Sequence, residues 1–147
     1  MEVTCEKVKA GAAIPSKKYA DDGCFDITSA ESVVIQSGTR KIVDSGLVIQ
    51  IPKGFFLRIL PRSGLSLRGL DIGAGVVDCG YLGSIGILLI NNSPENFVVN
   101  TGDRVAQVAL VKVENVVFKE ASTGLRPKSE RGTGGWGSTG ALTGLFI

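Results

Sequence analysis

The chain has 147 residues, 44% of them hydrophobic, and its 16 Lys and Arg against 14 Asp and Glu residues give a net charge of +2. This length suits one domain with a substantial core, and so small a charge gives no electrostatic reason to expect nucleic acid or an anionic membrane as a partner. The sequence contains no histidine, which excludes histidine-based nucleophilic catalysis, histidine general bases and zinc hydrolysis through histidine ligands.

The sequence also predicts the cellular location of the protein. The opening MEVTCEKVKA carries charges too early for a secretory signal, and no apolar run approaches the roughly 20 residues that span a bilayer. Cys5, Cys24 and Cys79 are odd in number and widely spaced, which argues against a disulfide framework and a structural zinc site. We therefore expect a soluble intracellular protein, in the cytoplasm or nucleus.

Short predicted strands alternate with turn formers such as SG, PKG, SPEN and NTGD. In chain order, the predicted strands are residues 33–36, 42–51, 55–60, 85–90, 97–100 and 105–118. Many brief strands with turns at close intervals are typical of an all-β sandwich or barrel, of jelly-roll or Greek-key type. The stretch at 64–73 predicts a short helical turn.

From about Ala121 the composition changes to Gly, Ser, Thr and charged residues. Glycine has the largest backbone entropy cost on folding, so this stretch is not expected to order itself. We expect one β domain at residues 1–120 and a flexible arm at 121–147. The arginine, hydroxyl groups and indole of RGTGGWGSTG suit phosphates and a flat ring, although composition alone also allows a plain flexible tail.

Four other stretches place polar residues beside glycines or in turns: GCFDIT at 23–28, PRSGLS at 61–66, GAGVVDCGYLGSIGI at 73–87 and TGDRVAQ at 101–107. The third stretch has the pattern of a hairpin. Each stretch alone has a simpler explanation, such as a β-turn, a surface ion pair, an edge residue or a bulge. Together with the C-terminal motif they supply arginines, hydroxyl groups and a glutamine, which are polyphosphate ligands without a P-loop.

In order and spacing, the five stretches resemble the five motifs of the trimeric dUTPase family, over about residues 15–140. The family hydrolyses dUTP to dUMP and pyrophosphate, which lowers dUTP and supplies dUMP for thymidylate synthesis. The resemblance implies a jelly-roll-type β-barrel and a homotrimer with active sites shared between subunits. It also implies Mg²⁺ as the cofactor, and a glycine-rich C-terminal arm that closes over the nucleotide.

The third motif carries the implied catalytic group. Asp78 resembles the carboxylate that activates the attacking water, and Asp is ionised at neutral pH, which suits a chain without histidine. Tyr81 resembles the aromatic residue that packs under the deoxyribose and excludes a 2′-hydroxyl. The implied hairpin reads uracil through its backbone, is too narrow for a thymine methyl and rejects cytosine by hydrogen-bond polarity. Its implied substrate-binding residues are Gly75, Val76, Val77 and Gly86.

The other motifs supply the implied phosphate contacts, and Arg131 resembles the residue that grips the terminal phosphate. Trp136 falls where the family usually places a Phe over the uracil. Asp26 resembles a carboxylate that helps to arrange the metal-bound triphosphate, so Mg²⁺ is expected mainly on the substrate's phosphates. The residues implied here in substrate binding are Arg62, Ser63, Gly64, Gln107, Arg131, Trp136, Gly137, Ser138 and Thr139.

The chain departs from the family pattern in four places. Cys24 stands where a glycine is expected, and Gly80 and Leu82 replace an acid and an arginine beside the tyrosine, so the arginine's structural ion pair is missing. The extension ALTGLFI is either a frayed tail or a segment that docks on a neighbouring subunit. Two alternatives remain. One is the deoxycytidine triphosphate deaminase branch, which needs a Glu in the third motif where Asp78 stands. The other is a non-catalytic module that binds a nucleotide or a partner.

Overall fold

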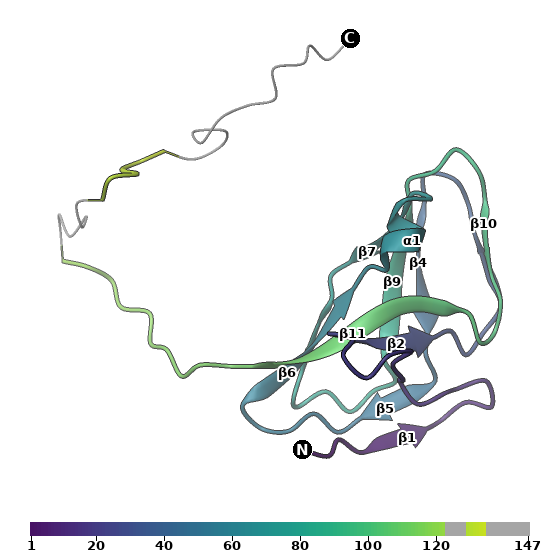
Figure 1. Ribbon diagram of the computed structural model, residues 1–147, viewed down its shortest axis with the longest axis horizontal. Helices are drawn as coiled ribbons and strands as arrows, with labels where there is room; N and C mark the ends of the chain where they lie inside the picture. Colours follow the sequence, from purple (N-terminus) through teal and green to yellow (C-terminus); the bar gives the residue numbers. More distant parts are fainter. Residues whose placement is uncertain (123–128, 135–147) are drawn as a thin grey trace, which may run out of the picture. The chain divides into compact units, whose positions relative to one another are not determined.

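The computed structural model describes residues 1–122 and 129–134. The chain divides into two units, Met1–Glu114, here called the β domain, and Asn115–Ile147, here called the C-terminal segment. Within the described residues, every strand and helix lies in the β domain (Figure 1). None of the helices in this part of the chain has the length and apolar composition that crossing a membrane requires.

The β domain is built from short strands and one helical turn, as the sequence predicts. In chain order they are β1 (Cys5–Lys7), β2 (Phe25–Thr28), β3 (Val33–Ile35), β4 (Arg40–Asp44), β5 (Leu47–Ile49), β6 (Phe55–Leu60), α1 (Ser63–Ser66), β7 (Leu70–Gly73), β8 (Val76–Asp78), β9 (Gly86–Asn91), β10 (Phe97–Val99) and β11 (Arg104–Lys112). The all-β prediction is confirmed, and α1 lies at the start of the predicted helical turn.

The strands pair antiparallel in four sheets. The largest sheet has the order β2-β11-β6-β8, the next has the order β4-β9-β7, and β1-β5 and β10-β3 form two-stranded sheets. Neighbouring strands are distant in sequence, so the connections cross between sheets, as in Greek-key topologies. In Figure 1, α1 and β10 lie near one end of the β domain and β1 and β5 near the other.

The core follows from the two-residue alternation of the strands. In β9, Ile87 and Leu89 are fully buried, while the alternate residues Leu88 and Ile90 are only partly buried. Ile27 in β2 and Ala106 in β11 are also fully buried. Because the apolar side chains of β2 and β11 point into the core, their neighbours Asp26 and Gln107 are directed to the opposite face.

Two predictions about strands are wrong. First, β11 ends at Lys112 rather than at 118, and Val116, Val117 and Phe118 are exposed. The register explains this end, because Lys112 pairs with Phe55, the first residue of β6. Strand propensity depends on a neighbouring strand and a surface to pack on, and β6 offers β11 no partner beyond this point.

Second, the stretch GAGVVDCGYLGSIGI does not form one paired hairpin. β8 pairs with β6, whereas β9 pairs with β4 and β7 in another sheet. The segment that joins them, residues 79–85, is here called the Tyr81 loop. Its glycines match a hairpin pattern locally, but longer-range pairing with β4, β6 and β7 decides where the flanking strands go.

Candidate active site

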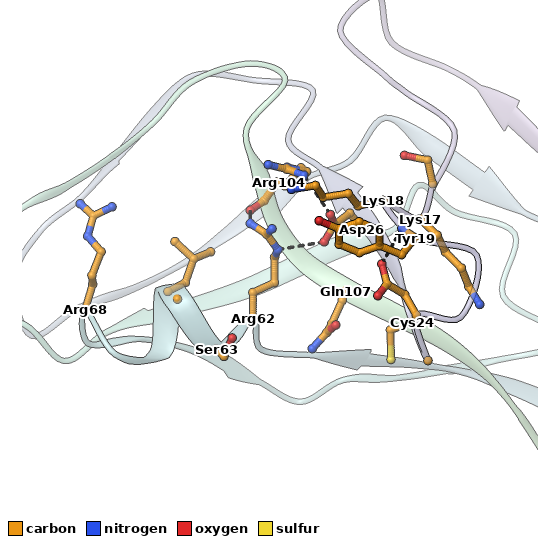
Figure 2. Close-up of a pocket in the computed structure, with 15 residues that line it drawn as sticks. Lys17, Lys18, Tyr19, Cys24, Asp26, Arg62, Ser63, Arg68, Arg104 and Gln107 are labelled. Carbon is orange, nitrogen blue, oxygen red and sulfur yellow. Dashed lines mark hydrogen bonds and ion pairs between the residues drawn. The ribbon is translucent and has the colours of Figure 1, made fainter.

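A polar cavity of about 520 Å³, here called the basic cavity, opens beside β2, β11 and α1 (Figure 2). Its lining includes two acidic side chains, Asp22 and Asp26, against five basic ones. The basic residues are Lys17, Lys18, Arg62, Arg68 and Arg104. This excess of positive charge suits an anionic ligand with several negative charges, such as a polyphosphate.

Strand register brings three of the predicted residues of this cavity together. Asp26 in β2 pairs with Gln107 in β11, and Gln107 pairs in turn with Leu60, the last residue of β6. Arg62 follows in the turn that leaves β6. The three motifs therefore meet in one row across adjacent strands, although they are up to about 80 residues apart in the sequence.

Asp26 holds the two arginines of this row in place. One carboxylate oxygen of Asp26 lies 2.8 Å from Nε of Arg62, and the other lies 3.3 Å from a terminal nitrogen of Arg104 (Figure 2). Arg62 also donates to the backbone carbonyl of Arg104 at 2.9 Å. Gln107 donates from its side-chain amide to the carbonyl of Pro61 at 2.7 Å. The arginines are thus oriented before any ligand arrives, which reduces the entropy that binding would cost.

Ser63 and Gly64 begin the short α1 turn and are exposed. Their backbone N–H groups belong to the first turn of a helix, so they have no acceptor within it. No side chain caps the start of α1. This turn therefore offers a hydroxyl and backbone donors beside the Arg62 guanidinium.

A second cavity, of about 510 Å³, lies over β8, β9 and the Tyr81 loop and is here called the apolar cavity. Its polar lining comes from Asp44, Asp78, Tyr81 and Ser84. The other lining residues are Ile42, Ala74, Val76, Val77, Ile85, Gly86 and Leu88. A mostly apolar cavity with a few polar groups suits a flat ring with polar edges.

Asp78 ends β8 and is exposed at this cavity. Tyr81 is half exposed, and its hydroxyl donates to the carbonyl of Ser84 at 3.1 Å. Gly86 begins β9, and a Cβ placed there would lie 2.8 Å from a methyl group of Ile42. A side chain at position 86 would therefore require Ile42 to shift.

Gly75 has a backbone role that the sequence alone does not reveal. Its φ is +108°, and a Cβ there would lie 2.7 Å from the carbonyl oxygen of Ile59. The amide of Ile59 donates to the carbonyl of Gly75 at 2.8 Å. Glycine is required here by the approach of two strands, and Gly75 is not among the residues that line the apolar cavity.

The two cavities share no lining residue. Asp78 pairs with Phe56 near the start of β6, whereas Gln107 pairs with Leu60 at its end. These positions are about 13 Å apart along the strand at roughly 3.3 Å per residue. The β domain thus brings the predicted phosphate ligands together and the predicted base-binding residues together, but it does not join the two groups into one site.

Comparison with known proteins identifies this arrangement. A sequence model of the dUTPase family matches residues 10–140. The chain belongs to the dUTPase family. The family match spans all five motifs and both cavities.

Curated relatives and solved structures agree with the family assignment. The chain is 40% identical to the deoxyuridine 5′-triphosphate nucleotidohydrolase of Variola virus, covering 88% of this chain and 86% of the relative. It is 41% identical to the enzyme of that name from Yarrowia lipolytica, covering 88% and 83%. Among solved structures, a mutant dUTPase of Staphylococcus bacteriophage 80alpha with dUpNHpp superimposes with a TM-score of 0.86 at 24% identity, covering 95% of this chain and 99% of that one.

The C-terminal motif of this dUTPase chain is described only in part. Arg131 lies in a turn in which its Nε donates to the carbonyl of Gly134 at 3.1 Å, and the amide of Gly134 donates to the carbonyl of Arg131 at 3.0 Å. The φ of Gly132, +53°, suits this turn. The predictions for Trp136, Gly137, Ser138 and Thr139, and for the extension at 141–147, lie outside the described residues.

The described departures from the family pattern lie in the basic cavity and in the Tyr81 loop. Cys24 lines the basic cavity, and its side chain is partly buried. Leu82 is 83% exposed in the Tyr81 loop. A Cβ at Gly80 would meet no atom within 4 Å, so glycine is not required there for lack of space.

The structure adds lining residues that the sequence analysis did not assign. Arg104 lies within the stretch at 101–107, whereas Lys17 and Lys18 lie outside every quoted stretch and only their charge points to the basic cavity. Nothing in the sequence indicates that Asp44 and Ser84 line the apolar cavity together. They are 40 residues apart, and only the folded chain brings their side chains into contact.

Proposed function

We propose that this chain hydrolyses dUTP to dUMP and pyrophosphate, which lowers dUTP and supplies dUMP for thymidylate synthesis. The family match over residues 10–140 carries the proposal. The composition of the two cavities supports it, because one is basic and suits a triphosphate and the other is apolar and suits a base and sugar. The substrate is an intracellular metabolite, so the proposed place of action is inside the cell.

In the proposed reaction, Asp78 is the general base. Its carboxylate accepts a proton from a water molecule, and the water oxygen attacks the α-phosphorus. The bond from the α-phosphorus to the oxygen that bridges to the β-phosphate breaks, and pyrophosphate leaves with that oxygen. The place of Asp78 at the mouth of the apolar cavity supports this role, because a base and sugar held there direct the α-phosphate outward.

The uracil and deoxyribose are assigned to the apolar cavity. Tyr81 packs under the deoxyribose and leaves no room for a 2′-hydroxyl. The backbone around Gly86 reads the uracil edge, Val76 and Val77 of β8 also line this cavity, and Gly75 preserves the local strand geometry. The site is proposed to be narrow at the uracil edge, so that an added methyl group is costly.

The triphosphate is assigned to the basic cavity. Arg62, Ser63, Gly64 and Gln107 are the proposed phosphate ligands, and bidentate Arg–phosphate contacts are among the strong charge-assisted hydrogen bonds. Once the phosphates bind, the amide of Gln107 exchanges its bond to the Pro61 carbonyl for a phosphate oxygen.

Mg²⁺ fits this cavity as a partner of the phosphates. Both carboxylate oxygens of Asp26 are engaged by arginines, so Asp26 suits contact through a metal-bound water better than direct ligation. One solved relative, the dUTPase of phage phi11 of S. aureus, coordinates a structural Mg(II) ion. When bound, Mg²⁺ would neutralise and orient the phosphates while keeping several of its waters.

The complete site is proposed to form between copies of the chain in a homotrimer. The separation of Asp78 from the phosphate ligands along β6 supports this arrangement, because one chain does not join the two parts. The C-terminal arm, residues 121–147, is proposed to close over the nucleotide. Arg131 would hold the terminal phosphate, Trp136 would stack on the uracil, and Gly137, Ser138 and Thr139 would complete the contacts.

Pyrophosphate release from dUTP, dTTP, dCTP and UTP in the presence of Mg²⁺ tests the proposal. We expect appreciable release from dUTP alone. Comparable release from UTP would contradict the role of Tyr81. Tight binding of a non-hydrolysable dUTP analogue without any release from dUTP would instead favour the non-catalytic module.

A further inference from the structure

A cluster of charged side chains lies behind the Tyr81 loop, outside the family motifs. Nζ of Lys9 lies 2.7 Å from one carboxylate oxygen of Asp44 and 3.7 Å from the carboxylate of Glu31. Glu31 also accepts a hydrogen bond from the backbone amide of Asp44 at 2.9 Å. Lys9 precedes β2 and Asp44 ends β4, so the cluster joins the N-terminal stretch of the chain to the edge of the apolar cavity.

The other oxygen of Asp44 points to the Tyr81 loop. It accepts a hydrogen bond from the Ser84 hydroxyl at 2.5 Å and another from the amide of Gly46 at 2.8 Å. The Asp44 side chain is only 24% exposed. Although this partial burial alone would raise the pKa of Asp44, the hydrogen bonds from Lys9, Ser84 and Gly46 lower it below its ordinary value. Asp44 is therefore held as a carboxylate with both oxygens in use.

Ser84 links the fixed carboxylate of Asp44 to Tyr81. The Tyr81 hydroxyl donates to the backbone carbonyl of Ser84 at 3.1 Å. The Tyr81 ring folds against Gly83, where a Cβ would lie 2.5 Å from the phenolic oxygen. Asp44, Ser84 and Tyr81 all line the apolar cavity. A continuous series of contacts thus runs from Lys9 through Asp44 and Ser84 to the ring that faces this cavity.

The rest of the Tyr81 loop offers little to hold the ring. Leu82 is 83% exposed, Cys79 is also exposed, and Gly80 has open space around it. The arginine that the family pattern places at position 82, with its structural ion pair, is absent. At Ile85 the backbone rejoins the domain through bonds to Leu47 and Ser45. Ser84 is thus the loop side chain that ties the tyrosine's end of the loop to β4.

We propose that Asp44, held by Lys9, is a positioning residue that fixes Tyr81 through Ser84 and so sets the discrimination between deoxyribose and ribose. This inference rests on the proposed function of Tyr81. The network replaces the missing ion pair at position 82 with one anchored on β4. A ring held against Gly83 keeps the sugar site narrow, whereas a ring free to move away would admit a 2′-hydroxyl.

The test compares five variants with the parent. Ser84→Ala removes the hydroxyl, and Ser84→Thr retains one. Asp44→Ala removes both anchored oxygens, and Asp44→Asn is a milder change of the same shape in case Asp44→Ala folds poorly. Glu114→Ala is the matched control, because Glu114 also pairs with a lysine, Lys112, at 3.5 Å but lines neither cavity.

Two readouts separate positioning from mere support of the fold. The first is the ratio of kcat/KM for dUTP to that for UTP. The second is the NMR spectrum of protein with ¹³C-labelled tyrosine rings. The chain has two tyrosines, so Tyr19, outside the network, serves as an internal reference for Tyr81.

For Ser84→Ala and Asp44→Ala, we expect the dUTP-to-UTP ratio to fall about tenfold, as for one lost hydrogen bond to a charged group. The Tyr81 ring signals should shift while those of Tyr19 stay. Ser84→Thr and Glu114→Ala should keep the parental ratio and spectrum. Unchanged Tyr81 signals, or an unchanged ratio with a lowered melting temperature, would overturn the inference and leave the network a support of the fold.

Failure of the proposed function gives a different result. A parent protein that releases no pyrophosphate from dUTP would contradict the enzymatic activity itself. The Tyr81 signals would still show whether Asp44 and Ser84 position the ring, because the NMR measurement needs no turnover.

Discussion

The two cavities of the β domain are built in different ways. The basic cavity rests on paired strands: β2, β11 and β6 fix Asp26 and Gln107 by register, and Asp26 orients the arginines. The apolar cavity depends on a loop, in which the Tyr81 hydroxyl donates to the Ser84 carbonyl and the Ser84 hydroxyl donates to Asp44. The proposed phosphate ligands are thus fixed by the sheet, whereas the ring that we propose excludes a 2′-hydroxyl is held by a short hydrogen-bond network.

This difference separates binding from chemistry. The basic cavity holds the proposed phosphate ligands, and the apolar cavity carries Asp78, the proposed base. Changes in the basic cavity should therefore act mainly on affinity, and changes around Asp78 mainly on turnover.

The largest effect is expected for Asp78→Asn. Loss of a positioned general base lowers kcat by about 100-fold or more, while a non-hydrolysable dUTP analogue should still bind because the basic cavity is intact. Pyrophosphate release and calorimetric titration measure the two quantities. Asp71→Asn is the control, since Asp71 is exposed and lines neither cavity. Parental turnover in Asp78→Asn would place the base elsewhere.

Arg62→Lys changes the basic cavity and should therefore act mainly on the affinity for dUTP. The lysine keeps the charge but loses the fork that both pairs with Asp26 and grips a phosphate. We expect KM for dUTP to rise about 10- to 100-fold, as for one or two lost charge-assisted hydrogen bonds, with a smaller change in kcat. Arg58→Lys, an exposed position on β6 outside both cavities, should behave as the parent. A fall in kcat alone would show that the basic cavity does not act through affinity.

Mixed oligomers of two inactive variants test whether one active site takes its basic cavity and its apolar cavity from different subunits. At a dUTP concentration well below the KM of Arg62→Ala, each variant should be nearly inactive alone. Co-expression of Asp78→Asn with Arg62→Ala should then recover about one quarter of the parental activity if each site joins neighbouring subunits head to tail. A site is intact only if one subunit carries the native Asp78 and its neighbour carries the native Arg62. Each condition holds for half of the subunits, so one site in about four is intact. Activity no higher than that of the separate variants would show that each chain uses its own two cavities.

Much of this arrangement was predictable from the sequence, and the exceptions have physical causes. The alternation in β6 and β9 and the PRSG turn were found because they depend on neighbouring residues. The end of β11 was missed because Val116 and Val117 have strand propensity but no partner strand. The contact between Asp44 and Ser84 was missed because it depends on the pairing of β4 with β9, which places Asp44 opposite Gly86.

A substitution at Gly75 tests whether this glycine is needed for the backbone geometry of the fold rather than for contact with the nucleotide. Gly75→Ala places a Cβ at a φ of +108° and 2.7 Å from the Ile59 carbonyl oxygen, so we expect the free energy of unfolding to fall by about 2 kcal/mol or more. Gly38→Ala is the matched control, because Gly38 also has a positive φ, +70°, but open space around it. It should cost about 1 kcal/mol. Equal losses in denaturant unfolding would mean that the approach of β6 is unimportant.

The smallest effect is expected from the pH dependence of the Asp44 network. The pKa of Asp44 is lowered in the folded chain, so its contribution to stability is complete above the ordinary value of 3.8 and is lost as the pH falls through the folded value. The pKa of Lys9 is raised above 10.5, first through its hydrogen bond to Asp44, so its contribution is complete below 10.5 and is lost as the pH rises through the folded value.

Between pH 3.8 and pH 10.5, the difference in melting temperature between the parent and Asp44→Asn should therefore be constant. The difference should shrink below pH 3.8 and again above pH 10.5, and it should be small throughout, because partly exposed ion pairs contribute little. Glu31 also faces Lys9, so Glu31→Gln in the Asp44→Asn background should remove the remaining change at high pH. A difference that is the same at pH 3 as at pH 7 would show that the charge of Asp44 does not matter. Its role in placing Ser84 and Tyr81 would then depend on shape alone.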